Sequence, residues 1–445
     1  MPPETNLNAA PLGLGIDLGS SGLRVALVSM APEKAEERPL WHDASPYPGR
    51  FEDPTSWWQG LIGLCGRIPD ALRVRVGAVA IDGTSGTVLL CRPDGSLLPG
   101  TLGLALPYHQ ACPAQADAAR MLATGGPDGP SAAAASASGS LARALQLLEQ
   151  AGRHAPTAAA QLLVRHQADW LMGQLLGHWR WGEATNNLRL GWRQGQQPGW
   201  AGAIGLQPWS AALPEVIDCG TVAGCLHHEP AAALGLPTGA VVVAGCTDAS
   251  AAVLAAKAAP GDGITVLGTT LALKQWVRAP IHAAGVSCQR LAGRWLVGGA
   301  SNAGGGVLRQ VFDDAQLTEL SRQINPRRPS GLSLRPLPGM GERFPVDDPL
   351  LEPVLAPRPV SDALYLQALL EGLAAIEAAG WQRLQQLGAP PVTRVISLGG
   401  GARNPQWRAI RQQTLGVPVL NRPQLSAAAG MARLAAQALQ HPPHG

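Results

Sequence analysis

The first residues that could do chemistry are polar side chains close to the start of the chain. Asp17 precedes a Gly-Ser-Ser-Gly turn at 19–22, and Arg24 follows it. Glycine lets a backbone lie close to a ligand, while hydroxyl, amide and guanidinium groups donate hydrogen bonds to phosphate oxygens. Phosphate would repel Asp17 unless a cation lay between them, and a hydrated Mg²⁺ meets that need. The turn therefore predicts a Mg-nucleotide site formed by Gly19, Ser20, Ser21 and Arg24.

Two other phosphate-binding motifs can be compared with this turn. A Walker A loop needs Gly-Lys followed by Ser or Thr, but Lys34, Lys257 and Lys274 are followed by Ala, Ala and Gln. A dinucleotide-binding Gly-x-Gly-x-x-Gly motif leads into a helix, whereas residues 24–28 are a strand-like run. The sequence excludes the first motif and argues against the second. An ordinary hairpin with a solvent-exposed Asp17 stays open as the alternative.

A second candidate is Asp248, which follows the apolar run Ala-Val-Val-Val-Ala at 240–244 and precedes an alanine-rich segment. This pattern predicts a buried strand that leads into a helix, with Asp248 at the carboxyl end of the strand. Ligands of open α/β sheets bind at such ends, where a carboxylate can accept a proton. Asp is also a common helix N-cap, and its position does not separate the two roles.

The stretch at 264–277 repeats the pattern at 16–28, which is a strand, a glycine, two hydroxyl residues and a second strand. An internal repeat of this kind predicts two similarly built halves, each with a phosphate-binding hairpin. Two further glycine-rich turns, at 304–306 and 399–401, lie between a strand and a helix, where an anion can bind. The nucleotide-binding residues predicted in this half are Gly268, Thr269, Thr270, Gly305, Gly399 and Gly400.

Sheets and helices must position these residues, and 445 residues suffice for more than one domain. Apolar residues recur at helical spacing over 162–176, and strand-like runs flank a polar loop at 82–87. That loop is either a plain turn or a hydroxyl-binding loop at the mouth of a cleft. Prolines and glycines at 229–239 precede the strand that leads to Asp248 and indicate a boundary. The expected division is a flexible tail at 1–11, a domain at 12–235 and a domain at 236–445.

Composition narrows the class of protein. The net charge is +3, 15% of residues are charged, and the basic residues are scattered, so neither nucleic acid nor a membrane is an expected partner. The seven cysteines form no Cys-x-x-Cys pair, so neither a zinc site nor a disulfide framework is expected. The start of the chain lacks a signal-peptide pattern, and no apolar run has membrane-spanning length. We expect a cytoplasmic enzyme, either a monomer or a homodimer.

Taken in order, the motifs resemble those of the FGGY carbohydrate kinases, a family within the actin, Hsp70 and hexokinase superfamily. The resemblance extends from Leu12 to about Ala436. It is carried by the segments Gly15–Arg24, Asp169–Leu171, Gly245–Ala249, Gly268–Thr270, Gly341–Pro345 and Gly399–Asn404. The resemblance implies an α/β fold with two ribonuclease-H-like domains around a central cleft, the first for the sugar and the second for the nucleotide.

The family also implies roles at the matching positions. Asp248 would bind the sugar and act as the general base that takes a proton from its hydroxyl group. Asp17 would lie at the substrate and hold Mg²⁺ through water. ATP would donate the phosphate, and its binding residues would include Ser20, Arg24, Gly268, Thr269, Gly399, Gly400 and Asn404.

The loop at 82–87 bears on the choice of sugar. Xylulose kinases of this family carry Gly-Gln-Met-His-Gly where this chain has Asp-Gly-Thr-Ser-Gly, a form that looks closer to ribulose kinases. The resemblance therefore favours D-ribulose, with Ser85 in contact with it, and leaves D-xylulose or another FGGY sugar or polyol as the alternative. Tyr108-His109-Gln110 departs from the Tyr-Asn-Asp of relatives, so the role of that loop stays open. From a different class, an actin- or Hsp70-like ATPase would hydrolyse ATP without any sugar.

Overall fold

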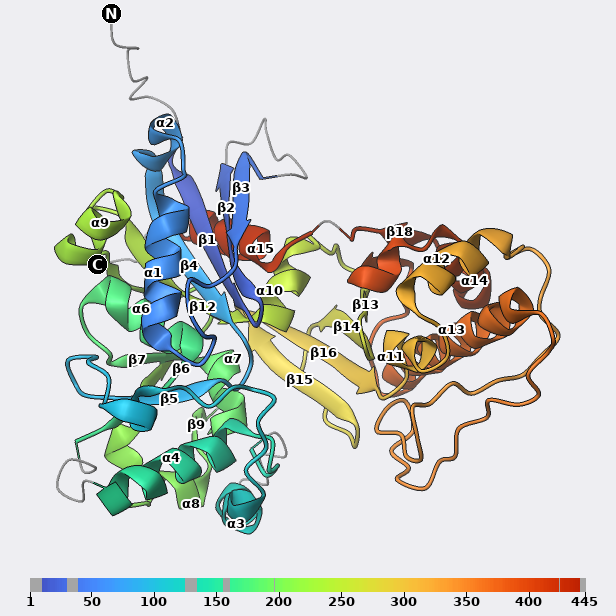
Figure 1. The fold of residues 1–445 in the computed structure, drawn as a ribbon, viewed down its shortest axis with the longest axis horizontal. Coiled ribbons are helices and arrows are strands. Elements are labelled where there is room, and N and C mark those ends of the chain that lie inside the picture. The colour runs from blue at the N-terminus through green and yellow to red at the C-terminus, as the bar shows by residue number, and fades with distance from the viewer. Residues whose placement is uncertain are drawn as a thin grey trace, which may run out of the picture. The chain divides into compact units, whose positions relative to one another are not determined.

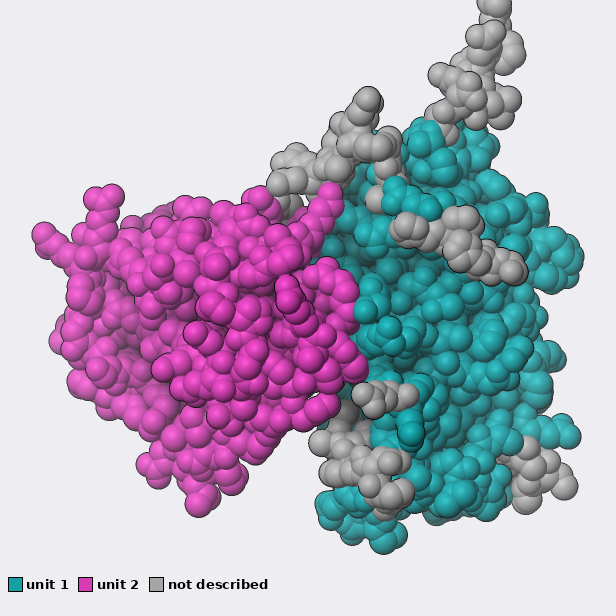
Figure 2. All heavy atoms as spheres, turned by 180° about the vertical axis from the view of Figure 1, so that it is seen from behind, with its two compact units in different colours: residues 1–255, 290–293, 426–445 teal, residues 256–289, 294–425 magenta. Residues whose placement is uncertain are grey.

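The computed structural model describes residues 10–29, 39–124, 134–154, 161–195, 197–423 and 425–440. The chain forms two compact units, coloured separately in Figure 2. The first comprises residues 1–255, 290–293 and 426–445, and the second comprises residues 256–289 and 294–425. Of the predicted flexible tail at 1–11, residues 1–9 lie outside the described part of the chain.

The first unit is built on a six-stranded sheet with the strand order β11-β12-β4-β1-β2-β3. Its strands are β1 (Leu12–Gly19), β2 (Gly22–Ser29), β3 (Trp41–Ser45), β4 (Val76–Gly83), β11 (Val222–Cys225) and β12 (Val241–Thr247). β1, β4 and β12 run parallel, whereas β1, β2 and β3 form an antiparallel meander. Fully buried aliphatic residues of β1 and β4, such as Ile16 and Val79, pack in one core with Trp57 of the first helix.

Helix α1 (Pro54–Cys65) begins where its residues favour a start, because Asp53 accepts a hydrogen bond from the Thr55 N–H at 2.9 Å and Pro54 opens the first turn. The other helices of this unit are α2 (Asp70–Arg73), η2 (Gly100–Gly103), η3 (Pro113–Gln115), α3 (Ala116–Thr124), α4 (Ser140–His154), α6 (Gln167–Leu176), α7 (Ala184–Asn187), η4 (Leu188–Leu190), α8 (Gly202–Gly205), η5 (Ser210–Ala212), α9 (His228–Leu234), α10 (Asp248–Ala255) and α15 (Ala427–Ala438). Its short strand pairs are β5 (Val88–Cys91) with β6 (Leu163–His166), β7 (Trp181–Glu183) with β10 (Glu215–Ile217), and β8 (Trp192–Arg193) with β9 (Gly199–Trp200).

The last helix, α15, returns from the end of the sequence to lie against β1 and α10, as the red helix beside the blue strands in Figure 1 shows. Glycine on β1 permits this close approach, since a Cβ at Gly15 would lie 1.9 Å from the carbonyl oxygen of Ala428. The predicted boundary at 235/236 therefore differs from the one in the structure. β12 pairs with β4 inside the first unit, so the division falls at 255/256, and residues 426–445 rejoin the first unit.

The second unit repeats this plan. Its six-stranded sheet has the order β15-β16-β14-β13-β17-β18. The strands are β13 (Asp262–Leu267), β14 (Leu271–Val277), β15 (Val286–Leu291), β16 (Arg294–Ser301), β17 (Arg394–Leu398) and β18 (Val419–Asn421). β13 is antiparallel to β14 and parallel to β17, just as β1 is antiparallel to β2 and parallel to β4. The expectation of two similarly built α/β halves, each opened by a hairpin, is confirmed.

Helix α13 (Asp362–Gln386) forms the centre of the second unit, with buried Leu366, Leu369 and Leu373 in its core. Around it lie α11 (Gly305–Arg309), α12 (Asp314–Gln323), η6 (Gly400–Arg403) and α14 (Pro405–Leu415). Among the described residues, α13 is the one helix with the length and apolar composition of a membrane span. Its most apolar stretch is 61% buried within the protein, which is the environment of a core helix.

The segment at 162–176, where spacing predicted one helix, holds the strand β6 and then α6. β6 pairs with β5, so Leu163–His166 extends across a second strand instead of coiling.

Candidate active site

Three carboxylates lie at one edge of the sheet of the first unit. Asp17 on β1 is paired in register with Asp82 on β4, and Asp82 is paired with Cys246 on β12, two residues before Asp248. Because β1, β4 and β12 are parallel, their carboxyl ends share an edge, where α/β sheets bind ligands. The structure thus brings together the predicted residues Asp17 and Asp248. Asp82, which the sequence assigned to the polar loop, is the second-last residue of β4.

Asp82 is the most deeply buried of the three carboxylates. Its side chain has no exposed area, and neither of its carboxylate oxygens has a hydrogen-bond partner among the described residues. Burial is the main cause that raises the pKa of Asp82 well above its usual value, and the charges of Asp17 and Asp248 raise it further. A carboxylate in this position requires a proton or a cation beside it.

Asp17 is 5% exposed, and its Oδ2 lies 3.1 Å from Nη1 of Arg24, its partner across the hairpin. The guanidinium that the sequence assigned to a phosphate is thus engaged by a carboxylate in this structure. In the described ranges, no group of three or more His, Cys, Asp or Glu side chains is placed to hold a metal ion by itself. Mg²⁺ often uses one or two protein carboxylates and completes its shell with water and substrate phosphates.

Asp248 is partly exposed at the first residue of α10, and its Oδ1 accepts a hydrogen bond from the Ala249 N–H at 2.7 Å. Burial is the largest cause that raises the pKa of Asp248, and the charge of Asp17 adds to it. The hydrogen bond from the Ala249 N–H, the charge of Arg189 and the nearby backbone of Ser85 act in the opposite direction. A raised pKa makes this carboxylate a stronger base, which suits removal of a proton from a hydroxyl group. Sequence reasoning missed Arg189, because only the fold brings η4 close to Asp248.

The tip of the first hairpin is a tight turn. Gly19 pairs with Gly22, and Ser20 and Ser21 form the exposed two-residue tip between them. The hydroxyl of Tyr47 donates a hydrogen bond to the carbonyl oxygen of Gly19 at 2.7 Å. The predicted hairpin is confirmed, and its phosphate contacts stay a prediction.

Gln167 at the start of α6 holds the loop that follows Asp82. Its Oε1 accepts hydrogen bonds from the Thr84 N–H at 3.1 Å and from the Thr84 hydroxyl at 2.8 Å. The hydroxyl oxygens of Thr84 and Thr87 lie 2.6 Å apart, and both side chains are buried. Ser85 between them is partly exposed. Of the three hydroxyl groups in this loop, that of Ser85 is therefore the most accessible to a ligand.

Arg143 on α4 connects this loop to the one at 107–110. Its Nη1 donates to the carbonyl oxygen of Gly86 at 2.9 Å, its Nε donates to that of Gln110 at 2.8 Å, and its Nη2 donates to that of Tyr108. Burial lowers the pKa of Arg143 to about 10. The loop at 107–110, whose role the sequence left open, is thus hydrogen-bonded through its backbone carbonyl oxygens to the same arginine that holds the 82–87 loop.

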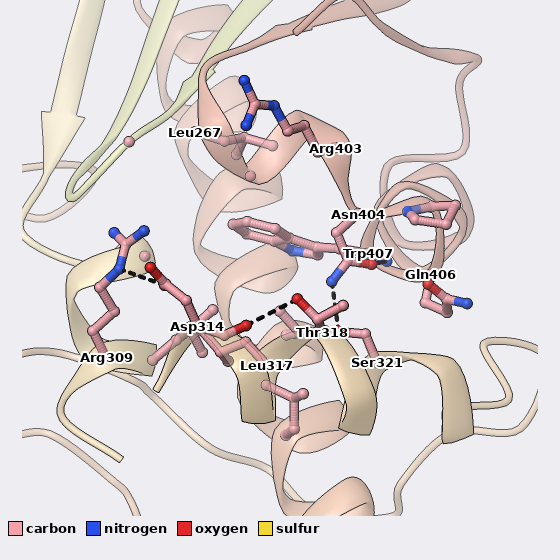
Figure 3. A pocket seen from close by; sticks show the side chains of 18 of the residues that line it. Leu267, Arg309, Asp314, Leu317, Thr318, Ser321, Arg403, Asn404, Gln406 and Trp407 are labelled. Atoms are coloured by element: carbon pink, nitrogen blue, oxygen red, sulfur yellow. Dashed lines mark hydrogen bonds and ion pairs between the residues drawn. The ribbon is translucent and has the colours of Figure 1, made fainter. Parts of the chain in front are cut away.

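A pocket of about 790 Å³ lies within the second unit (Figure 3). Five of the predicted nucleotide-binding residues line it, namely Gly268, Thr269, Gly305, Gly400 and Asn404. Thr270 and Gly399 flank these residues without lining the pocket themselves. The turns are in direct contact, since the N–H groups of Gly305 and Gly306 donate to the carbonyl oxygens of Gly268 and Thr269, both at 2.9 Å.

Side chains of α11, α12, α13 and α14 also line this pocket, and the sequence did not predict these helices as part of the site. Asn404 caps α14 by accepting from the Trp407 N–H at 2.9 Å, and its Nδ2 donates to the Ser321 hydroxyl at 2.8 Å. At the side of the pocket away from Asn404, Nε of Arg309 lies 3.0 Å from Oδ1 of Asp314 (Figure 3). The pocket combines glycine backbone, a ring of Trp407 and polar side chains, which suits a nucleotide.

Comparison with known proteins matches the second half of the chain to a family domain and the whole chain to a fold. Residues 256–439 match the C-terminal domain of the FGGY family of carbohydrate kinases. The fold is similar to that of a xyloylose kinase from Brucella ovis (TM-score 0.76, 21% identity, 96% of this chain and 90% of that chain). It is also similar to a xylulose kinase from Rhodospirillum rubrum (0.75, 20%, 98% and 91%) and to Plasmodium falciparum glycerol kinase with ADP (0.75, 13%, 97% and 90%). Residues 256–439 therefore match the C-terminal domain of FGGY carbohydrate kinases, and the chain as a whole shares the fold of sugar and glycerol kinases.

Proposed function

We propose that this protein is an ATP-dependent carbohydrate kinase that phosphorylates a ketopentose, with D-ribulose as substrate and D-ribulose 5-phosphate as product, and that Asp248 is the general base. The observation that carries the proposal is the position of Asp248. Its carboxylate lies at the edge where β1, β4 and β12 end, its pKa is raised by burial, and the backbone of Ser85 lies close enough to lower that pKa. A base in contact with the substrate-side loop is what activation of a sugar hydroxyl requires.

In this reaction Asp248 accepts the proton of the sugar hydroxyl as its oxygen bonds to the γ-phosphorus of ATP, and the bond from that phosphorus to the oxygen of the departing ADP breaks. Phosphoryl transfer of this kind depends on positioning and on neutralised charge more than on covalent catalysis. For the donor, we propose the pocket of the second unit, with Asn404 and the turns at Gly268 and Gly400 around the nucleotide. Ser20 and Ser21 in the first hairpin would donate to its phosphates.

For Mg²⁺ we propose Asp17 as the residue that holds the ion through water, with Asp82 beside it. The carboxylate oxygens of Asp82 are buried and accept no hydrogen bond among the described residues, so their chemistry fits a hydrated divalent cation. When bound, the ion would neutralise negative charge on the phosphates. Arg24 would then exchange its contact with Asp17 for one with a phosphate.

The choice of D-ribulose rests on the loop at 82–87. Ser85 in this loop offers an accessible hydroxyl, where the xylulose kinases of the FGGY family carry a histidine. D-xylulose is the second candidate, because several proteins of similar fold are described as xylulose kinases. The cysteines among the described residues are free thiols, which supports a cytoplasmic location.

An ADP-release assay over D-ribulose, D-xylulose, other ketopentoses, polyols and aldoses tests the substrate. We expect the highest kcat/KM with D-ribulose, and an equal or higher value with D-xylulose would refute that choice. Asp248→Asn tests the base. It should keep nucleotide binding, measured by calorimetry, and lose turnover by roughly 10²- to 10⁴-fold. Near-normal turnover in this variant would overturn the assignment, and ATP hydrolysis that no sugar accelerates would favour the ATPase class.

A further inference from the structure

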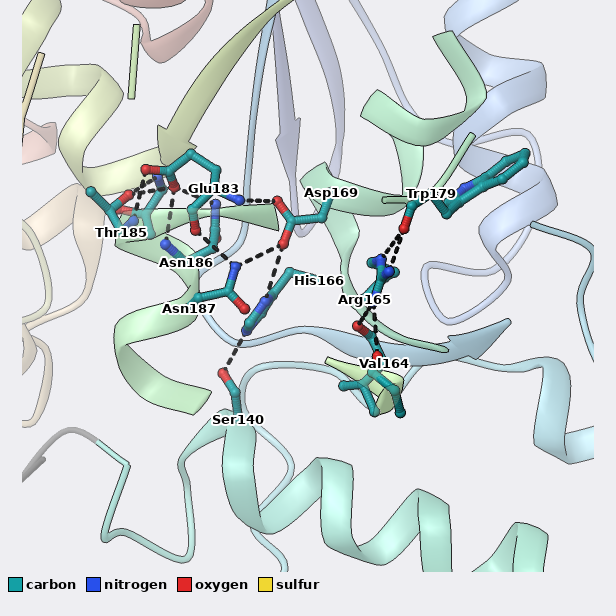
Figure 4. Close-up of polar contacts among 12 residues, drawn as sticks. Ser140, Val164, Arg165, His166, Asp169, Trp179, Glu183, Thr185, Asn186 and Asn187 are labelled. Carbon is teal, nitrogen blue, oxygen red and sulfur yellow. Dashed lines mark hydrogen bonds and ion pairs between the residues drawn. The ribbon is translucent and has the colours of Figure 1, made fainter. Parts of the chain in front are cut away.

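The Asp-Trp-Leu motif at 169–171 has no part in the reaction described above. In the structure its aspartate belongs to a buried polar cluster in the first unit (Figure 4). Asp169 accepts hydrogen bonds from the Glu183 N–H at 2.9 Å and from Nδ2 of Asn187 at 3.1 Å, and its Oδ2 lies 3.5 Å from Nδ1 of His166. Nε2 of His166 lies 2.9 Å from the Ser140 hydroxyl. The cluster therefore fixes the backbone of Glu183 from several sides.

Glu183 is 2% exposed and uses both carboxylate oxygens within α7. Its Oε1 accepts from the Thr185 N–H at 2.7 Å. Its Oε2 accepts from the Thr185 hydroxyl at 2.7 Å, from the Asn186 N–H at 3.0 Å and from Nδ2 of Asn186 at 3.1 Å. Each of these contacts has the carboxylate as acceptor.

The Thr185 hydroxyl has one proton, and Glu183 accepts it. The oxygen is left with lone pairs, and one of them accepts a hydrogen bond from the Thr247 N–H at 3.2 Å. The Thr247 N–H can only donate, so Glu183, by accepting the hydroxyl proton, orients the Thr185 oxygen with a lone pair toward it. Thr185 and Thr247 are 3% and 6% exposed, so water has little access to either group.

Thr247 is the last residue of β12 and immediately precedes Asp248. β11 pairs with β12 only as far as Val243, and the turn before β11 contacts β12 as far as Ala244. Beyond that point, on the side of β12 that faces β11, the Thr247 N–H bonds to the Thr185 hydroxyl oxygen and not to a strand carbonyl. The Thr247 hydroxyl donates to that of Ser250 on α10 at 2.9 Å, which holds the same residue from its other side.

We propose that Thr185, oriented by Glu183, is a positioning residue for Asp248, an inference that rests on the proposed role of Asp248 as the base. The Thr185 hydroxyl holds the Thr247 N–H, the last backbone N–H before the base. It thereby fixes the backbone at the end of β12 and the position of the Asp248 carboxylate relative to the sugar. Without it, the strand end would have a buried N–H with no acceptor, and the carboxylate would shift from its productive position.

The test compares Thr185→Ser, which keeps the hydroxyl, with Thr185→Val, which keeps the shape and removes it. We expect Ser to retain kcat close to the wild-type value. Val should lower kcat on the order of ten- to a hundredfold, as small misplacements of a reacting group do. The KM for ATP should not change, because the proposed nucleotide pocket belongs to the second unit. Wild-type kcat in the Val variant, or an equal loss in the Ser variant, would overturn the inference.

A double-mutant cycle separates positioning from general damage to the fold. In an Asp248→Asn background, Thr185→Val should leave the residual turnover unchanged, since its effect passes through the carboxylate. A full further loss there would contradict the inference. Full activity of Asp248→Asn alone would instead refute the base assignment in the proposed function. If Thr185→Val does not fold, Thr185→Ala serves as the variant that lacks the hydroxyl, and the same loss of kcat is expected.

Discussion

The buried Asp82 gives a prediction about stability as well as about activity. Replacing it by Asn keeps the size of the side chain and removes the ionisable carboxyl group. In the structure Asp82 has no exposed area, no hydrogen-bond donor among the described residues and the Asp17 carboxylate as a close neighbour. An Asn at this position could donate its NH₂ to Asp17, so a repulsive contact becomes a hydrogen bond to a charged group.

The magnitude follows from the cost of burying a polar group without a partner, which is about 1–3 kcal/mol. For a domain of 150–250 residues, each kcal/mol changes the thermal midpoint by about 2–4 °C, so Asp82→Asn should raise it by about 2–12 °C. The size of this stabilisation depends on pH. Because the folded-state pKa of Asp82 is raised, its contribution to stability is complete below the unfolded-state pKa and is lost as pH rises through the folded-state pKa. The advantage of the Asn variant should therefore grow with pH.

Calorimetric unfolding of ligand-free protein between pH 5 and pH 9 measures this difference. Asp117→Asn is the matched control, because Asp117 on α3 is 89% exposed and should show no such growth. The same Asp82→Asn variant should need more Mg²⁺ for half-maximal turnover. A variant that is less stable than the wild type at pH 9, or whose advantage does not increase with pH, would refute the reasoning.

Three further predictions concern the proposed site. Asp17→Ala should raise the Mg²⁺ requirement and leave sugar affinity without nucleotide near the wild-type value by calorimetry; a collapse of sugar affinity alone would make Asp17 a sugar ligand. Ser85→Ala should reduce the preference for D-ribulose over D-xylulose in kcat/KM by roughly tenfold, because one buried hydrogen bond contributes about 1–3 kcal/mol. The KM for ATP should not change. Asp248 must be ionised to accept a proton, and its pKa is raised, so kcat/KM should begin to fall on acidification at a pH above the ordinary pKa of Asp. The residual rate of Asp248→Asn should not show this fall.

Local patterns sufficed to predict the parts of the site that depend on neighbours in sequence. The turns at 19–22 and 268–270 and the strand that ends before Asp248 follow from glycine, hydroxyl and apolar residues within a few positions of one another. The occurrence of the same strand-turn-strand pattern twice in the sequence predicted that the two halves have the same fold.

Residues that depend on register or on packing could not be predicted in this way. Asp82 resembles a loop residue until the pairing of β4 with β1 and β12 places it beside Asp17. Ser321 lines the proposed nucleotide pocket because one face of α12 meets α14, and nothing in its local sequence indicates a ligand. The domain boundary was placed too early for the same reason, since proline and glycine mark the turn before β12 but not the sheet that β12 joins.

The return of α15 to the first unit has a consequence for synthesis of the protein. α15 covers β1, β2 and β4, yet it is synthesised only after the whole of the second unit that follows those strands. The residues of the second unit are nearly contiguous, from 256 to 425 apart from 290–293. Domains generally fold as units during translation, so the half that begins first is the half completed last. Until residue 438 emerges, one apolar face of the N-terminal sheet has no cover, and a nascent chain paused in that interval is the form that most needs a chaperone.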